Sequence, residues 1–313
     1  MLHLGRLRAL CEVADRGTIA AAADALHLTP SAVSQQLAAL ERDVGERLVE
    51  PDGRSIRLTP VAHVLIRRAQ TIFAEVESMH AEVAEHAAGE RADLRIGAFA
   101  TAIARIVAPA AGALRKAAPG IRLAIVEAEA PDAFARLGRQ ELDVVVSMEA
   151  PSVPGLDDPR ITRIALAADP LDAVVPVSHP LAARDAIDLA ALRGEPWVGP
   201  PGGWTCEQVI VGACQAAGFT PDIVHRAGEW RALAAIAGAE LGVGLLPRLA
   251  GVTSGAGAVI RPLTGPPPCR HLFVACRRGA EGAPAMRAVL DALVESAGAT
   301  GPAEFRTLLP SAA

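Results

Sequence analysis

The stretch TIAAAADALHLTPSAVSQQLAALERD, residues 18–43, decides the fold of the N-terminal part. It contains two short helical patterns that meet at a tight turn. Each pattern has one apolar face, formed by Ile19, Ala22, Ala23 and Leu26 in the first and by Val33, Leu37 and Leu40 in the second. Thr29 is a typical N-cap residue, and Pro30 follows at the first helical position, where its missing N–H is not needed. The spacing predicts a helix-turn-helix.

The outward face of the second helix carries short polar side chains. Such hydroxyl and amide groups suit base edges and phosphates in a major groove. The alternative is that both helices are ordinary core helices of a small helical domain. We predict DNA contacts for Thr29, Pro30, Ser31, Ser34, Gln35 and, from the following segment, Arg54.

The segment after the second helix reads as a β-hairpin, or wing. Leu48-Val49 and Ile56-Arg57-Leu58 flank a Pro51-Asp52-Gly53 turn. Arg54 could reach a phosphate or the minor groove, although a solvated turn charge is the alternative. Up to Arg57 the chain has seven arginines and eight acidic residues, which argues against tight non-specific DNA binding.

A long helix is predicted from Pro60 to about Ala88. Its apolar residues alternate spacings of four and three, as in a coiled coil: Leu65, Ala69, Ile72, Val76, Met79 and Val83. Such a narrow stripe favours pairing with a second copy of the chain over packing within one chain. We expect residues 1–59 to form the DNA-binding domain and residues 60–89 to form a dimerisation helix.

From Asp93 onward, strand and helix patterns alternate, which predicts a mostly parallel sheet covered by helices. We expect a two-lobed domain over residues 93–298 and a disordered tail over residues 299–313. The predicted first lobe comprises about 93–165 and 268–298, and the second comprises 166–267. Ligands in such folds bind near helix N-termini at the carboxyl ends of strands.

The loops that face the expected cleft between the two lobes supply the candidate effector residues. They are Ala100, Thr101, Glu129, Ser147, Met148, Gly203, Trp204, Thr205 and Trp230. Thr101 could bond an anionic group beside free backbone N–H groups. Glu129 and its acidic neighbours would repel an anion, so a zwitterionic, cationic or apolar effector also fits. For each residue the alternative is ordinary surface or packing.

The bulk properties narrow the class of protein. The chain has 313 residues and a net charge of −5, and it contains no apolar run of the length that spans a membrane. Because the N-terminus lacks a signal-peptide pattern, we expect a cytoplasmic protein. Of five cysteines, Cys206 and Cys214 lie two helical turns apart, which makes a redox sensor conceivable, although buried cysteines are commoner.

In order, these segments resemble a LysR-type transcriptional regulator over nearly the whole chain. The matching residues are Gly17-Thr18-Ile19, Ala22-Ala23, Leu26, Pro30 to Ser34, Leu40-Glu41, Gly45, Leu48, Arg54, Leu58-Thr59, Leu94 to Gly97, Leu142-Asp143 and Gly242 to Pro247. One departure is in the wing, where Val49 and Pro51 replace the family's usual Phe and Arg.

The resemblance implies a winged helix-turn-helix, a coiled-coil linker helix and an effector domain resembling type 2 periplasmic binding proteins. It also implies a homodimer or, more often, a homotetramer on double-stranded promoter DNA. The expected effector is a small organic acid or amino acid, and RNA polymerase is a candidate partner.

Two rival classes use only the two lobes. An enzyme could draw on Cys206, His179 and Asp185, but no catalytic motif stands in a suitable context. A small-molecule-binding protein would leave the N-terminal helices without a role beyond structure. We therefore expect no catalysis, no cofactor and no metal.

Overall fold

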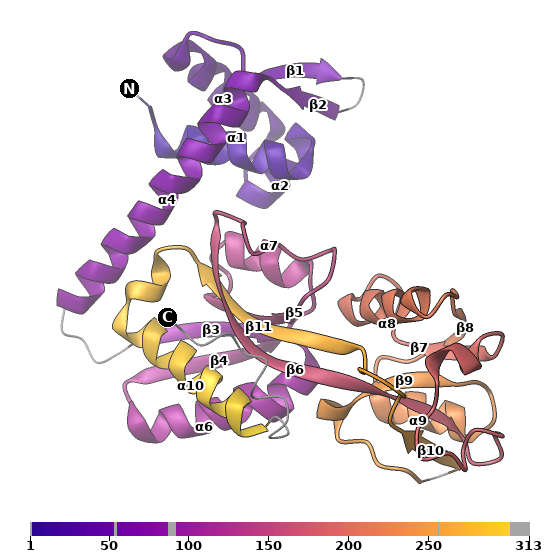
Figure 1. Cartoon of the computed structure of the whole chain (residues 1–313). Coiled ribbons are helices and arrows are strands. Elements are labelled where there is room, and N and C mark those ends of the chain that lie inside the picture. The colour runs from indigo at the N-terminus through magenta and orange to yellow at the C-terminus, as the bar shows by residue number, and fades with distance from the viewer. Residues whose placement is uncertain (1, 53–54, 87–91, 256, 301–313) are drawn as a thin grey trace.

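The computed structural model describes residues 2–52, 55–86, 92–255 and 257–300. Its N-terminal head contains three helices and a two-stranded wing (Figure 1). Their bounds are α1 Leu4–Arg16, α2 Ile19–Leu26, α3 Pro30–Val44, β1 Val49–Asp52 and β2 Ser55–Leu58. The predicted helix-turn-helix is confirmed, and Arg54 lies outside the described residues.

Local side-chain chemistry fixes the geometry of the head. Thr29 caps α3 by accepting a hydrogen bond from the Ala32 amide at 3.2 Å, as its sequence position predicts. Glu41 holds the wing, because its Oε1 accepts from the Leu48 amide at 2.8 Å. The apolar faces of the three helices meet in a core that includes Leu7, Leu10, Val13, Val33, Leu37, Leu40 and Leu48.

The linker helix α4, Pro60–His86, leaves the head and runs toward the effector domain (Figure 1). Its predicted stripe divides between two environments. Leu65 packs on the head and Ala69 is fully buried in the head core, so the prediction that Ala69 pairs with a second copy is wrong. Ile72, Met79 and Val83 expose 38%, 52% and 61% of their surface.

A seven-stranded sheet forms the centre of the effector domain. Its order is β10-β6-β11-β5-β3-β4, with β9 also paired to β6. The strands are β3 Ala92–Ala98, β4 Ile121–Glu127, β5 Val144–Met148, β6 Ile161–Pro176, β9 Gly244–Pro247, β10 Ala258–Arg261 and β11 Cys269–Arg277. A separate parallel pair contains β7 Pro196–Gly199 and β8 Asp222–Arg226.

The prediction of a mostly parallel sheet is wrong. In the large sheet only the β3–β4 and β3–β5 pairings are parallel, and the other pairings are antiparallel. The main reason is that β11 returns between β5 and β6. Strand β6 is 16 residues long and continues through Pro170. Both β6 and β11 are long strands that connect the two lobes (Figure 1).

Helices complete the two lobes on either side of these strands. Lobe I, built on β3, β4 and β5, carries α5 Ala100–Ala102, a π-helical turn Ile103–Val107, α6 Ala108–Ala117, α7 Asp132–Gly138 and α10 Pro284–Thr300. Lobe II, built on β7 to β10, carries α8 Thr205–Ala216, α9 Trp230–Gly238 and short 3₁₀ turns at Leu189–Leu192 and Arg248–Ala250. Another 3₁₀ turn, Ala280–Gly282, precedes α10 and packs against α4.

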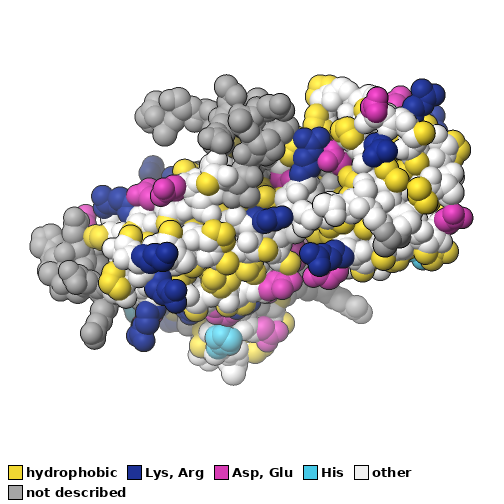
Figure 2. All heavy atoms as spheres, turned by 90° about the horizontal axis from the view of Figure 1, so that it is seen from below, with side chains coloured by type: hydrophobic (Ala, Val, Ile, Leu, Met, Phe, Trp, Pro, Cys, Tyr) yellow, Lys and Arg dark blue, Asp and Glu magenta, His cyan; other side chains and the backbone are white. Residues whose placement is uncertain are grey.

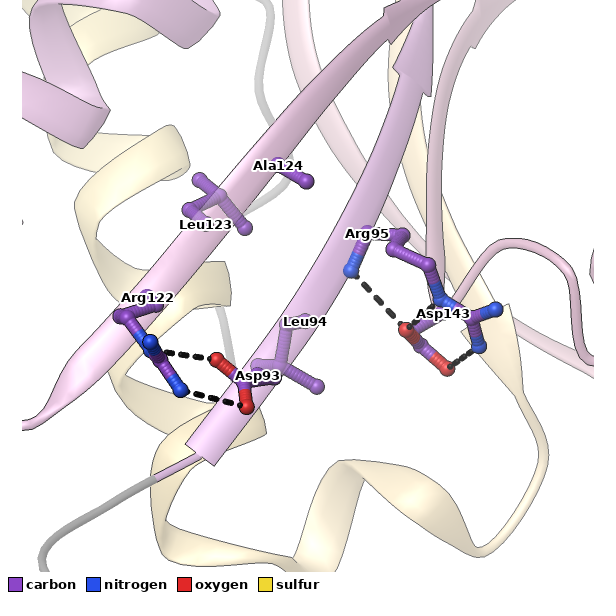
Figure 3. Close-up of a pocket in the computed structure, with 7 residues that line it drawn as sticks. All are labelled: Asp93, Leu94, Arg95, Arg122, Leu123, Ala124 and Asp143. Atoms are coloured by element: carbon purple, nitrogen blue, oxygen red, sulfur yellow. Dashed lines mark hydrogen bonds and ion pairs between the residues drawn. The ribbon is translucent and has the colours of Figure 1, made fainter.

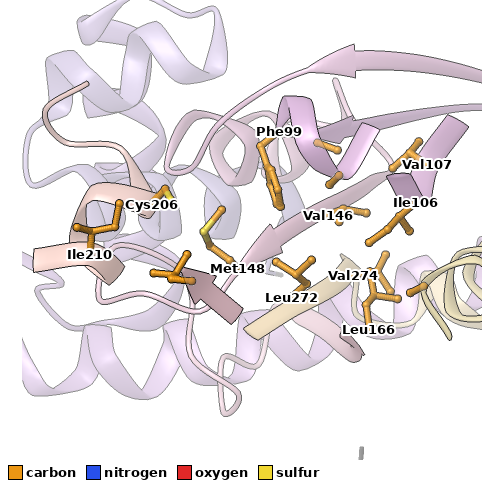
Figure 4. Close-up of a cluster of buried hydrophobic side chains, with 14 of the residues drawn as sticks. Phe99, Ile106, Val107, Val146, Met148, Leu166, Cys206, Ile210, Leu272 and Val274 are labelled. Carbon is orange, nitrogen blue, oxygen red and sulfur yellow. The ribbon is translucent and has the colours of Figure 1, made fainter. Parts of the chain in front are cut away.

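A buried apolar cluster joins the lobes. Figure 4 shows Phe99, Met148 and Leu272 from lobe I and the long strands beside Cys206 and Ile210 of α8. These side chains are at most 4% exposed. Among the described residues, no helix is long and apolar enough to cross a membrane.

Candidate DNA-binding face and effector site

The outward face of α3 presents Ser31, Ser34 and Gln35 to solvent, as the sequence predicts. The Thr29 and Ser31 hydroxyls lie 3.0 Å apart, and the Ser34 hydroxyl donates to the Pro30 carbonyl at 2.9 Å. These contacts hold the three hydroxyl oxygens in place at the start of the helix. The Gln35 side chain has no hydrogen-bond partner within the described chain, so both ends of its amide can bond a base.

Arg42 extends this face by two turns and was missed in the sequence analysis. It is exposed, and its Nε donates to the Ala38 carbonyl at 3.3 Å. Its i+7 spacing from Gln35 is the signal that could have identified it. In the wing, by contrast, Arg57 pairs with Glu50 at 2.7 Å, which neutralises its charge.

Charge elsewhere gives no broad basic surface on the face drawn in Figure 2. There the basic and acidic side chains are interspersed among apolar ones. A field of mixed sign does not attract DNA over a wide area. The α3 face, where Ser31, Ser34, Gln35 and Arg42 are exposed, is therefore taken as the candidate for DNA contact, and no basic patch on the face of Figure 2 rivals it.

Arg270, at the start of β11, is the centre of the candidate effector site. Its side chain is 1% exposed, and its Nε donates to Oδ2 of Asp169 at 3.0 Å. Its Nη2 donates to the Thr101 hydroxyl at 3.2 Å. The guanidinium carbon lies 5.2 Å from the centre of the Phe99 ring and 5.8 Å from that of Trp230. Arg270 also lies near Cys206, where its charge partly opposes the rise that burial causes in the pKa of the thiol.

Three helices begin at this arginine. Thr101 is the second residue of α5, Cys206 is the second of α8, and Trp230 is the first of α9. No side chain in the described chain caps any of these three N-termini. Their first N–H groups therefore remain available to an anionic group, which the helix dipoles also favour.

Thr205 provides a second indication of a ligand. It is 1% exposed, yet its Oγ1 has no hydrogen-bond partner in the described structure. A buried hydroxyl without a partner is unfavourable by about 1–3 kcal/mol. The hydroxyl lies in the first residue of α8, so a group bound at that N-terminus could satisfy it.

Glu129 adds a titratable group to the same site. Burial raises its pKa to about 7, Arg270 opposes this shift, and Glu127 adds to it. Because Asp169 already neutralises Arg270, Glu129 has no dedicated cationic partner. Its carboxyl group changes charge near neutral pH, and it would prefer a cationic or hydrogen-bond-donating group of a ligand.

The structure therefore brings together Thr101, Glu129, Thr205 and Trp230 among the predicted residues. Met148, 1% exposed, packs in the apolar cluster of Figure 4, which gives it a structural role there. Ser147 is 4% exposed at the end of β5, and its contact with a ligand stays a prediction. The other three predicted residues lie beside the site. They are the exposed Ala100, the exposed Gly203 and Trp204, whose ring packs against Gly228.

The two cysteines of α8 are not positioned to react with each other. Cys206 and Cys214 are eight residues apart on one helix, which separates them by about 12 Å, well beyond disulfide reach. Both are buried, and burial raises their pKa values to about 11 and about 12. In this conformation neither thiol has the low pKa and exposure typical of a redox-sensing cysteine.

Family models match most of the chain. Residues 4–63 match the model described as "Bacterial regulatory helix-turn-helix protein, lysR family", and residues 87–298 match "LysR substrate binding domain". The chain belongs to the LysR family of transcriptional regulators.

Individual proteins agree with this assignment. The transcriptional dual regulator GltC of Bacillus subtilis is 26% identical over 247 residues, covering 79% of this chain and 81% of GltC. A full-length OxyR variant of Pseudomonas aeruginosa superposes with a TM-score of 0.61 at 22% identity, covering 96% of each chain. Full-length CbnR, solved with its target DNA, gives a TM-score of 0.54 at 22% identity, covering 95% of this chain and all of CbnR.

The LysR assignment confirms the predicted function class: a transcriptional regulator with a DNA-binding head and an effector domain. Arg270 and Asp169 were missed in the sequence analysis because they lie 101 positions apart and belong to no recognisable local pattern. The local signal for Arg270 is weak: it precedes His271 and the apolar run Leu272–Cys276 in β11, and the strand ends in a second arginine, Arg277.

Proposed function

We propose that this LysR regulator senses a zwitterionic, amino-acid-like effector at Arg270 and reads its operator with the outward face of α3. The observation that supports this effector class is that one site offers both groups that favour an anion and a group that favours a cation. Uncapped helix N-termini and the unpartnered Thr205 hydroxyl favour a carboxylate. Glu129 favours an ammonium group.

A simple carboxylate fits this site less well. Asp169 already neutralises Arg270, so an added carboxylate would have no spare cation and would be repelled by Glu129 whenever that group is ionised. An ammonium group beside Glu129 removes that repulsion and favours the ionised form of the carboxyl group. Ligand entry requires α8 to separate from lobe I, because Thr205 and Arg270 each expose only 1% of their surface.

We further propose that the chain forms a homodimer through the exposed part of α4. Ile72, Met79 and Val83 are exposed there at spacings of seven and four, which suits a coiled-coil partner. A homotetramer and contact with RNA polymerase remain expectations from the family resemblance. The location in the cytoplasm remains an expectation from the N-terminal sequence pattern. We propose no catalytic activity.

Thermal shift tests the effector class directly. Each of the twenty amino acids is compared with the carboxylic acid that lacks its amino group, since binding to the folded state raises the melting temperature. We expect a shift from an amino acid and none from its matched acid. Glu129→Gln should abolish the shift, whereas Glu127→Gln, a control on the neighbouring carboxyl group, should retain it. A simple carboxylate that binds the wild type and Glu129→Gln equally would overturn the proposed effector class.

A further inference from the structure

We propose a second small-molecule site in the cavity between the head, the linker helix and lobe I, suited to an organic anion with an apolar body. The cavity has a volume of about 750 Å³, within the range of small-molecule sites. Its walls come from α1, α4, α7 and the loop 152–161, so it is separate from the site at Arg270.

Specific contacts hold the walls of this cavity in place. Arg160, before β6, joins head to lobe, because its Nη1 donates to Asp15 of α1 at 2.6 Å. Arg8 of α1 donates to the Gly138 carbonyl of α7 at 3.3 Å. Gly279, with φ +93°, lets the turn before α10 lie directly on the Ala74 carbonyl of α4, where any side chain would collide.

A closed ring of polar contacts fixes α4 to lobe I beside the cavity. Glu77 of α4 pairs with Arg277 Nε at 3.2 Å, and Arg277 lies 3.5 Å from Asp143. Asp143 accepts from Arg95 Nε at 3.1 Å (Figure 3), Arg95 donates to the Gln140 carbonyl, and Gln140 Nε2 donates back to Glu77 at 3.0 Å. The wall is therefore preorganised.

The charge of the walls selects an anion. Arg16, Arg160 and Arg277 each pair with a carboxylate that also lines the cavity. Arg8 and Arg278 differ, because in the described structure their donors reach only main-chain carbonyl groups. Neither arginine forms an ion pair within the described chain, although Arg278 lies near enough to Asp158 to help lower the pKa of that carboxyl group. Two such cations in one cavity would bind a carboxylate, sulfonate or phosphate group.

The rest of the lining selects an apolar body. Phe73 and Val76 of α4 lie on one wall, and Phe134 and Leu137 of α7 lie on another. A ligand with a ring or a short alkyl chain would bury this surface. Because it would contact head and lobe together, it would stabilise their docked arrangement by linkage.

By contrast, the smaller cavity of Figure 3, of about 430 Å³ along β3 and β4, offers no comparable cation. There Arg122 pairs with Asp93 at 2.7 Å and Arg95 pairs with Asp143. Arg122 therefore provides a matched control for Arg8.

The test uses 1-anilinonaphthalene-8-sulfonate, an aromatic anion whose fluorescence rises on binding, titrated into the full-length protein. We expect saturable binding to the wild type. Arg8→Gln should raise the dissociation constant of the dye about fivefold or more. Two substitutions that fill the cavity, Ala135→Trp and Gln70→Trp, should each abolish binding. Arg122→Gln and the Arg270-site variant Thr205→Val should bind like the wild type. Circular dichroism confirms that each variant is folded.

Three results would overturn the proposal. One is binding that Arg8→Gln and both cavity-filling variants leave unchanged, which would place the dye elsewhere. Another is no saturable binding by the wild-type protein, with or without dissociation of its oligomer, as monitored by sedimentation. Binding that appears only after dissociation would mean that a second copy of the chain occupies the cavity, and this too contradicts a small-molecule site.

Discussion

Arg270 and Asp169 form an ion pair that is buried on both sides, with side-chain exposures of 1% and 4%. Removing one partner of such a pair leaves a charge without compensation and destabilises a protein by about 3–5 kcal/mol. We expect Asp169→Asn to lower the free energy of unfolding by about 3 kcal/mol. Asp172→Asn, in the more exposed pair with Arg248, should lower it by less than about 1 kcal/mol. Urea denaturation followed by circular dichroism measures both; equal losses would contradict the role given to burial.

Glu129 should make stability depend on pH near neutrality. Its folded-state pKa of about 7 lies above its ordinary value of 4.5, so the folded state binds the proton more tightly. The resulting stabilisation is complete below about pH 4.5 and is lost as pH rises through 7. Glu129→Gln should therefore be more stable than the wild type at pH 8, by about 3 kcal/mol, and equally stable at pH 4. Chemical denaturation at pH 8 and at pH 4 measures the difference in unfolding free energy, with Glu127→Gln as the control.

The α3 face should contribute to DNA binding in two distinguishable ways. Gln35→Ala should weaken operator binding by about 1–3 kcal/mol while leaving non-specific binding unchanged, because a free amide can read a base edge. Arg42→Gln should weaken binding to all sequences. It should also reduce the slope of log K against log salt concentration by about one. Fluorescence anisotropy at several salt concentrations separates the two effects. Equal losses on operator and random DNA for Gln35→Ala would refute base readout.

The exposed part of α4 should control oligomerisation. Ile72→Glu with Met79→Glu places charges in the expected coiled-coil seam and should convert the dimer to a monomer. Arg67→Glu, an exposed position on another face of the same helix, should leave the dimer intact. Light scattering gives the mass in each case, and a monomeric wild-type protein would rule out the seam.

The thiols of α8 should be inert in the native protein. Because burial raises the pKa values of Cys206 and Cys214 to about 11 and about 12, we expect no measurable labelling of either by a disulfide reagent at pH 7.5 within minutes. Unfolding in urea should expose all five cysteines. Mass spectrometry after brief treatment with hydrogen peroxide provides a second check, and a Cys206–Cys214 disulfide in that sample would show that α8 opens readily.

The sequence predicted local features better than those that depend on long-range contacts. Thr29 and Pro30 specify the start of α3 by themselves, and the periodic face of α4 specifies a helix. The prediction for Ala69 was wrong because the apolar stripe is buried in the head core at one end of α4 and exposed to solvent at the other. Thr101 and Trp230 at the site were predicted from their positions at helix starts, but Arg270 and Asp169 at its centre were not, because they come from two strands that are distant in the sequence.

The continuous strands β6 and β11 limit how an effector can act. Since no loop separates the lobes along these strands, closing around a ligand must twist the sheet, and lobe I turns with it. The ring at Glu77 makes α4 follow lobe I. A helix of 27 residues is about 40 Å long, so a rotation of roughly 5° at its base moves the far end by roughly 3.5 Å, about one base-pair step. A twist of the sheet too small to alter any single contact would thus shift one head along the DNA relative to the head of the partner chain.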